Sequence, residues 1–131
     1  MADASDELLR AAGLSRSKVA AVKDLAKKSL VGEIPTRRAA EKLSDSDLVE
    51  CLTAVRGIGT WTVEMFLIFT LGRPDVLPLD DYGVRKGFAR TYGRDVLPKP
   101  KELAALGEKW RPFRTAASWY LWHALELEGR A

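Results

Sequence analysis

Two adjacent aspartates stand where an irregular loop leads into a helix, in the stretch DVLPLDDYGVRKGF. Acids at a helix start usually accept hydrogen bonds from its free amides, and this capping role is the interpretation that we favour for Asp80. Asp81 is the better candidate for chemistry, because a carboxylate beside a helix N-terminus stays ionised at neutral pH. Such an anion can stabilise positive charge that develops on a substrate. The sequence therefore offers Asp81 as a candidate catalytic residue.

A second group of residues suits an anionic ligand. In LTAVRGIGTWTVEMFLIF the glycines of Gly57-Ile58-Gly59 separate two apolar stretches, as in a tight hairpin between helices. Glycine allows positive φ angles, and without a side chain it lets a ligand approach the main chain. Gly59 and Thr60 also stand at the start of the next helix, where free amides favour a phosphate. A plain turn with a glycine cap explains the same pattern equally well.

Tryptophans could add a stacking surface. On the last helix, Trp122 projects opposite an apolar stripe that we expect to face the core. The stripe consists of Phe113, Ala117, Tyr120, Ala124 and Leu127. Trp122 is then available for stacking, although packing against a neighbouring helix is the commoner role of such a residue. The same alternatives apply to Trp61 and Trp119. Glu64 is either a second pocket acid or half of an ion pair.

The composition limits the class of protein. Among 131 residues, 21 lysines and arginines oppose 18 acids, and this net charge of +3 permits a polyanionic partner without requiring one. No apolar run is long enough to span a membrane. The single cysteine, Cys51, excludes an internal disulfide, and the single His123 excludes a histidine-rich metal site. We expect a protein of the reducing cytoplasm with no catalytic metal.

The elements that must position these residues are helices. Apolar residues recur at helical spacing, and no stretch alternates strictly between apolar and polar. The first expected helix runs from Ser15 to Leu30, a short second helix follows Pro35, and a third begins at Ser44. The fourth covers 61–71, with Thr60 as its cap. A fifth begins near Asp81, a sixth begins after Pro100, and a seventh, with Pro112 in its first turn, runs to about Glu128. The helix over 61–71 is apolar almost all round and should lie at the centre of the fold. The sequence predicts an all-α helical bundle in one domain, residues 1–131.

Three stretches in this order resemble the helix-hairpin-helix (HhH-GPD) DNA glycosylase superfamily: VRGIGTWTVEMF, DVLPLDDYGVRKGF and EKWRPFRTAASWYLW. The branch that they look like is the 3-methyladenine DNA glycosylase II type, which removes alkylated bases. LLRAAGLSRSKVAAVKDLA is similar to the helical segment before the hairpin in that branch. The resemblance covers roughly residues 7–127.

The resemblance implies hydrolysis of the bond between deoxyribose and an alkylated purine such as 3-methyladenine, in double-stranded DNA and without a cofactor. The catalytic aspartate falls on Asp81, because Val84 and Arg85 match the apolar and basic positions after it. Aromatic positions of the base pocket fall on Trp61, Tyr82 and Trp122. Trp61 stands where bifunctional members carry a Schiff-base lysine, which implies hydrolysis without strand cleavage.

The same resemblance places the DNA backbone on Gly57, Ile58, Gly59 and Thr60, with Arg85 as a further phosphate contact. Main-chain carbonyls of such hairpins often also hold a monovalent cation. A DNA-bound protein of this kind would lie in the cytoplasm, on the nucleoid if its source is a prokaryote.

The sequence also departs from the family pattern. Members normally carry more helices before the segment that matches residues 7–30, and Met65 stands where the alkylation-repair branch often has an aromatic residue. The chain is then a natural short form, a fragment, or a protein that completes its bundle as a homodimer around the apolar helix over 61–71. Two other functions stay open: a non-catalytic DNA-binding module with an incomplete pocket, and a purely structural helical domain.

Overall fold

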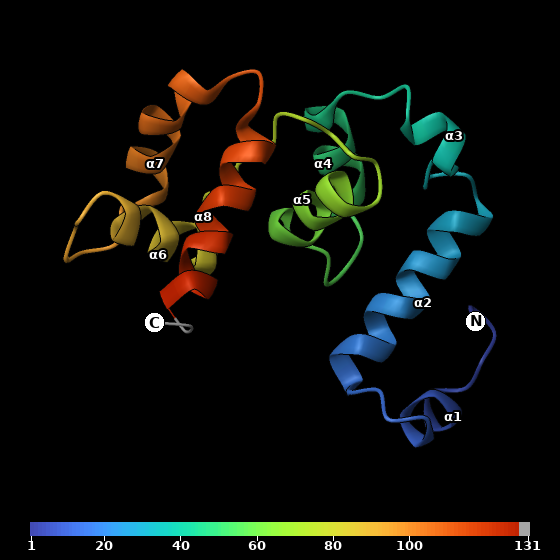
Figure 1. Cartoon of the computed structure of the whole chain (residues 1–131). Coiled ribbons are helices and arrows are strands. Elements are labelled where there is room, and N and C mark those ends of the chain that lie inside the picture. The colour runs from blue at the N-terminus through green and yellow to red at the C-terminus, as the bar shows by residue number, and fades with distance from the viewer. Residues whose placement is uncertain (129–131) are drawn as a thin grey trace. The chain divides into compact units, whose positions relative to one another are not determined.

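The computed structural model describes residues 1–128, and these residues form helices and no strand. In chain order the elements are α1 (Asp6–Ala11), α2 (Arg16–Leu30), α3 (Arg37–Ala40), α4 (Asp45–Thr53), α5 (Thr60–Phe69), α6 (Tyr82–Thr91), α7 (Pro100–Leu106), the 3-10 helix η1 (Gly107–Trp110) and α8 (Arg114–Glu128) (Figure 1). The prediction of an all-α chain is confirmed. Within the described range, every helix is too short or too polar to cross a membrane.

The chain separates into two compact units, Met1–Val63 and Glu64–Ala131. The first contains α1 to α4 and the first turn of α5. The second contains the rest of α5 and the elements α6 to α8. The assignment of residues 1–131 to a single domain stays a prediction.

Polar side chains begin the helices much as the sequence predicted. Ser15 caps α2 by accepting from the amide of Lys18, and Ser44 caps α4 by accepting from the amide of Asp47. α1 is a further helix, with Ser5 as its cap, and neither α1 nor η1 was predicted as an element. These caps supply acceptors for amides that have no partner within a helix.

Two predicted boundaries are wrong by a few residues. α5 begins at Thr60 itself and ends at Phe69 rather than at residue 71. The chain turns away there because Gly72 adopts a left-handed φ of 64° and the amide of Arg73 donates to the carbonyl of Leu67 at 2.9 Å. α8 begins at Arg114, so Pro112 precedes the helix instead of lying in its first turn.

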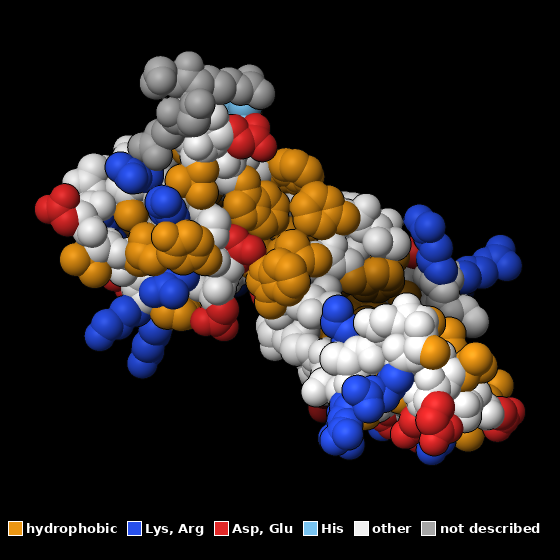
Figure 2. Space-filling view, turned by 90° about the horizontal axis from the view of Figure 1, so that it is seen from below, with side chains coloured by type: hydrophobic (Ala, Val, Ile, Leu, Met, Phe, Trp, Pro, Cys, Tyr) orange, Lys and Arg blue, Asp and Glu red, His pale blue; other side chains and the backbone are white. Residues whose placement is uncertain are grey.

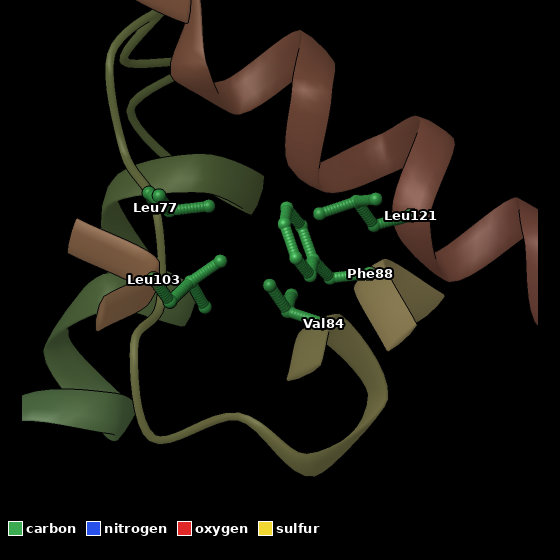
Figure 3. Packing of buried hydrophobic residues seen from close by; sticks show 5 residues of the cluster. All are labelled: Leu77, Val84, Phe88, Leu103 and Leu121. Carbon is green, nitrogen blue, oxygen red and sulfur yellow. The ribbon is translucent and has the colours of Figure 1, made fainter. Parts of the chain in front are cut away.

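The core of the second unit lies between α6, α7 and α8. Leu77, Val84, Phe88, Leu103 and Leu121 point toward one another there (Figure 3). α6 crosses α8 so closely that a Cβ on Gly87 would lie 2.0 Å from the carbonyl oxygen of Leu121. A glycine is therefore required at this crossing.

The three large residues of the predicted core stripe at α8 are exposed, which corrects the sequence interpretation. Phe113, Tyr120 and Leu127 are 65%, 76% and 55% exposed. Ser118 and Leu121 are buried instead, because the Ser118 hydroxyl donates to the carbonyl of Val76 at 3.0 Å and Leu121 meets α6. Figure 2 shows large apolar side chains at the molecular surface. Amphipathic spacing alone identified an apolar face on α8 but not the face that packs.

The helix α5 is also less buried than predicted. Val63, Leu67 and Ile68 are buried, whereas Trp61 and Phe69 are about half exposed. The expectation that this helix is enclosed on all sides is therefore wrong. Its apolar composition does not by itself mark a central position.

Candidate functional site

Asp81 is a buried carboxylate at the first turn of α6. It is 9% exposed, and its Oδ1 atom accepts a hydrogen bond from the amide of Val84 at 2.8 Å. The same Oδ1 accepts a second bond from Nε1 of Trp122 on α8 at 2.9 Å. Two N–H donors from two helices thus fix the orientation of the residue that the sequence proposed as catalytic.

The capping role falls on Asp81 and not on Asp80. Asp81 occupies the N-cap position of α6, whereas Asp80 is exposed. The prediction that Asp80 caps the helix is wrong by one residue. Either acid satisfies the sequence preference for a cap, so the sequence alone does not distinguish between them.

Trp122 lies against Asp81, partly buried beside the core cluster of the second unit. The indole of Trp122 stacks on Phe69 with ring centroids 6.0 Å apart, and Trp119 meets it edge-on at 5.8 Å. Trp122 therefore packs against other side chains of the fold, which is the commoner role of such a residue, and it also makes a polar contact with the candidate catalytic acid. Phe69 was not considered for the site from the sequence, and Trp119 was offered only with the two alternatives given for Trp61.

Gly83 makes this contact possible. A Cβ at this position would lie 2.9 Å from Cδ1 of Trp122 and 3.1 Å from Oδ1 of Asp81. Both separations are shorter than ordinary van der Waals contact, so a side chain here would push the indole from the carboxylate. Sequence reasoning missed Gly83, although a glycine in the first turn of a helix is a signal of close approach.

Glu64 adds a second acid to this unit. Burial, and after it the negative charges of Asp80 and Asp81, raise the pKa of Glu64 to about 7, although Arg114 opposes the shift. Arg114 itself is bound to Asp75, with Nε 2.8 Å from Oδ1. Glu64 therefore exchanges its proton near neutral pH.

The two remaining predicted residues of this unit lie on α6. Tyr82 is exposed, and Nζ of Lys86 lies 5.7 Å from the centre of its ring. The guanidinium of Arg85 donates through Nε to the carbonyl of Pro98 at 2.8 Å. This bond ties α6 to the loop before α7, so the predicted phosphate contact would have to use the other guanidinium nitrogens.

The predicted hairpin lies in the first unit. Gly57 has a φ of 82°, as expected for a tight turn, whereas Gly59 has no positive φ, so the expectation of left-handed glycines holds only for the first. A Cβ on Gly59 would meet no atom within 4 Å. Ile58 donates its amide to the carbonyl of Val55 at 3.1 Å, which closes the turn. Gly59 thus leaves open space beside the start of α5, where Thr60 and Trp61 follow.

The hairpin carbonyls are the only groups that the resemblance offers to a monovalent cation. The carbonyl of Val55 accepts from Ile58, and that of Gly59 accepts from Val63 at 3.3 Å. Each carbonyl keeps a second lone pair, and neutral oxygen donors suit a hard, weakly held cation. A monovalent cation at these carbonyls stays a prediction from the resemblance, and no step of the chemistry depends on it.

A family model described as HhH-GPD superfamily base excision DNA repair protein matches residues 1–112. DNA-3-methyladenine glycosylase 1 of Schizosaccharomyces pombe is 43% identical over 125 residues, which are 95% of this chain and 55% of that protein.

Solved structures agree with these matches. The S. pombe 3-methyladenine DNA glycosylase Mag1 in complex with abasic DNA is 44% identical, with a TM-score of 0.84 over 92% of this chain and 59% of that one. A DNA-3-methyladenine glycosidase from Bacillus halodurans is 38% identical, with a TM-score of 0.83 over 93% of this chain and 56% of that one. The chain thus spans a little over half the length of these proteins. It belongs to the HhH-GPD superfamily of base excision DNA repair proteins.

Proposed function

We propose that this chain carries the catalytic part of a monofunctional DNA glycosylase, which hydrolyses the N-glycosidic bond of alkylated purines such as 3-methyladenine. The observation that carries the proposal is the buried carboxylate of Asp81, fixed by Val84 and Trp122. The names of the relatives support the same activity. Double-stranded DNA with alkylated bases is then the substrate.

The chemistry needs a negative charge held in place. An alkylated purine carries a positive charge and leaves readily, and as it leaves, positive charge develops on the deoxyribose. A fixed carboxylate stabilises that charge and can orient or deprotonate the attacking water. Because Oδ1 of Asp81 already accepts two hydrogen bonds, the carboxylate does not have to reorient during the reaction.

The damaged base must first leave the duplex, at a cost of a few kcal/mol that damage reduces. Aromatic faces attract a cationic base, and Trp61, Tyr82 and Trp122 are the proposed pocket residues. Trp61 and Tyr82 are both well exposed, as a stacking surface requires. Trp61 also stands in place of a Schiff-base lysine, which supports hydrolysis without strand cleavage.

In this proposal the hairpin binds the DNA backbone. The main chain of Gly57, Ile58, Gly59 and Thr60 would approach a phosphate at the open side of Gly59. Such contacts read no sequence and would position the duplex on the chain.

Two assays on the same chain test the function. Release of 3-methyladenine from alkylated DNA is measured beside binding to an undamaged duplex. Base release that disappears in Asp81→Asn supports the glycosylase. Duplex binding without release would identify a non-catalytic DNA-binding module, and the absence of both would leave a structural domain.

A further inference from the structure

The turn at Gly57 is packed against α2. A Cβ on Gly57 would lie 2.9 Å from Cβ of Ala21, so the turn and the helix are in close contact. Asp24 stands three residues after Ala21 and so lies on the same face of α2. Ala21 and Asp24 are therefore positions of α2 that lie beside this turn.

Asp24 bonds the hairpin main chain directly. The amide of Arg56 donates to Oδ2 of Asp24 at 2.8 Å. Lys28, one turn further along α2, places Nζ 3.3 Å from Oδ1 and 3.2 Å from Oδ2. The hydrogen bond from Arg56, followed by the bond and charge of Lys28, lowers the pKa of Asp24 below its ordinary value. The carboxylate is therefore an anion at neutral pH.

The charge of Asp24 is opposite to what a phosphate site needs. An acid beside a surface that binds DNA weakens binding through repulsion, so a structural task is the better explanation of an acid at this position. The Arg56 amide supplies that task, because this bond and the contact between Gly57 and Ala21 constrain consecutive residues at the entrance of the turn.

We propose that Asp24 is the positioning residue of the hairpin: its carboxylate holds the Arg56 amide and so orients the main chain of residues 57–60 toward a DNA phosphate. The inference rests on the proposed function in one respect, namely that the hairpin contacts DNA. Asp24 itself touches no DNA in this arrangement and acts through the hydrogen bond alone.

Asp24→Asn and Asp24→Ala separate the hydrogen bond from the charge. Asparagine keeps a carbonyl oxygen that can accept from the Arg56 amide, whereas alanine removes the acceptor. Lys28→Ala removes the ion pair and keeps the acceptor. Asp6→Ala is a matched control, because it removes an acid that pairs with Lys23 of the same helix, Nζ to Oδ1 at 2.6 Å, away from the hairpin.

Binding is measured by fluorescence anisotropy with an undamaged duplex and an abasic-site duplex, at a temperature where circular dichroism shows every variant folded. Asp24→Ala is expected to weaken both complexes by about tenfold, the effect of losing one charge-assisted hydrogen bond. Asp24→Asn, Lys28→Ala and Asp6→Ala are expected to stay within about twofold of the parent chain. Equal binding by Asp24→Ala and the parent, or equal losses in Asp24→Asn and Asp24→Ala, would overturn the proposal.

The Arg56 amide gives a readout that does not depend on DNA. In ¹H–¹⁵N spectra its proton resonance is expected to follow the titration of Asp24, with a midpoint below that of an ordinary aspartate. Its exchange with solvent is expected to become faster in Asp24→Ala but not in Lys28→Ala. An amide that exchanges equally in the parent and in Asp24→Ala would refute the positioning role. If the parent chain binds no duplex at all, the proposed function fails, and this measurement still decides whether Asp24 holds the hairpin.

Discussion

Oδ1 of Asp81 accepts one hydrogen bond from the start of α6 and another from Trp122 on α8. One atom therefore links the cap of a helix to an aromatic residue 41 positions away in the sequence. Changes at single residues can separate the structural task of this carboxylate from its proposed chemistry, because asparagine keeps an acceptor and loses the charge.

Asp81→Asn is expected to abolish base release while damaged-DNA binding stays within about tenfold of the parent, because the charge acts mainly on the transition state. Single-turnover release of 3-methyladenine and anisotropy with the same duplex measure the two quantities. Asp80→Asn is the matched control, since Asp80 is exposed and caps no helix. Activity in Asp81→Asn together with none in Asp80→Asn would move the catalytic assignment by one residue.

Gly83→Ala is expected to reduce base release by separating Trp122 from Asp81, since the added methyl would lie 2.9 Å from the indole. Alanine is otherwise about 1 kcal/mol more favourable than glycine within a helix, so a fall in thermal stability would also reflect this contact. Trp122→Phe, which keeps a ring but no N–H, is expected to reduce release in the same direction. Parent-like release by Gly83→Ala would show that the close approach is unimportant.

The raised pKa of Glu64 predicts that the stability of the folded chain depends on pH. Its pKa rises from 4.5 to about 7 on folding, so between these values the folded chain holds a proton that the unfolded chain has lost. The stability that this proton contributes is complete below the unfolded pKa and is lost as pH rises through the folded pKa.

In Glu64→Gln this dependence is absent. The difference in Tm between variant and parent is therefore expected to grow in favour of the variant from about pH 5 to pH 7 and then to level off. Circular dichroism melts across this range measure it, and the other titrating groups cancel in the difference. A difference that does not vary with pH would show that Glu64 titrates as an ordinary acid.

At the scale of elements, the hairpin glycines differ in what they tolerate. Gly57 has a left-handed φ and lies against Ala21, whereas Gly59 has neither constraint. Gly59→Ala is therefore expected to fold normally and to weaken binding to damaged and undamaged duplexes alike, because its methyl enters the space beside the proposed phosphate contact.

Gly57→Ala is the contrasting variant and is expected to lower the Tm. Melting curves and anisotropy with both duplexes distinguish the two glycines. A loss of binding to damaged DNA alone in Gly59→Ala would assign the hairpin to the base pocket instead of the backbone.

Local signals in the sequence predicted the helices well. Ser15 and Ser44 are caps whose side chains accept from amides three residues later, and the acceptor and the amide belong to one short stretch. The burial of α8 could not be predicted in this way. Two apolar faces compete on that helix, and the choice depends on Val76 and on α6, which lie far away in the sequence. The same limit applies to the site, because Asp81 was identified from its motif whereas its contacts with Trp122 and Gly83 required the fold.

At the scale of the whole molecule, three large apolar side chains on and just before α8 are exposed. Tyr120, Phe113 and Leu127 of the exposed α8 stripe line an open groove of about 530 Å³. Contiguous exposed apolar side chains are candidate surfaces for a partner. The homodimer that the sequence suggested around α5 is thus better placed on α8.

We predict a homodimer held by this α8 stripe. Because the interface is apolar, the association is expected to change little with salt, unlike an interface of ion pairs. Sedimentation velocity at low micromolar concentration, with and without added salt, measures the mass. Tyr120→Arg is expected to give a monomer, since it puts a charge into the interface, while Tyr92→Arg should have a smaller effect, because Tyr92 lines the same groove from the end of α6 and is outside the α8 stripe. A compact, stable monomer of the parent chain at these concentrations would show that the stripe stays exposed without a second copy.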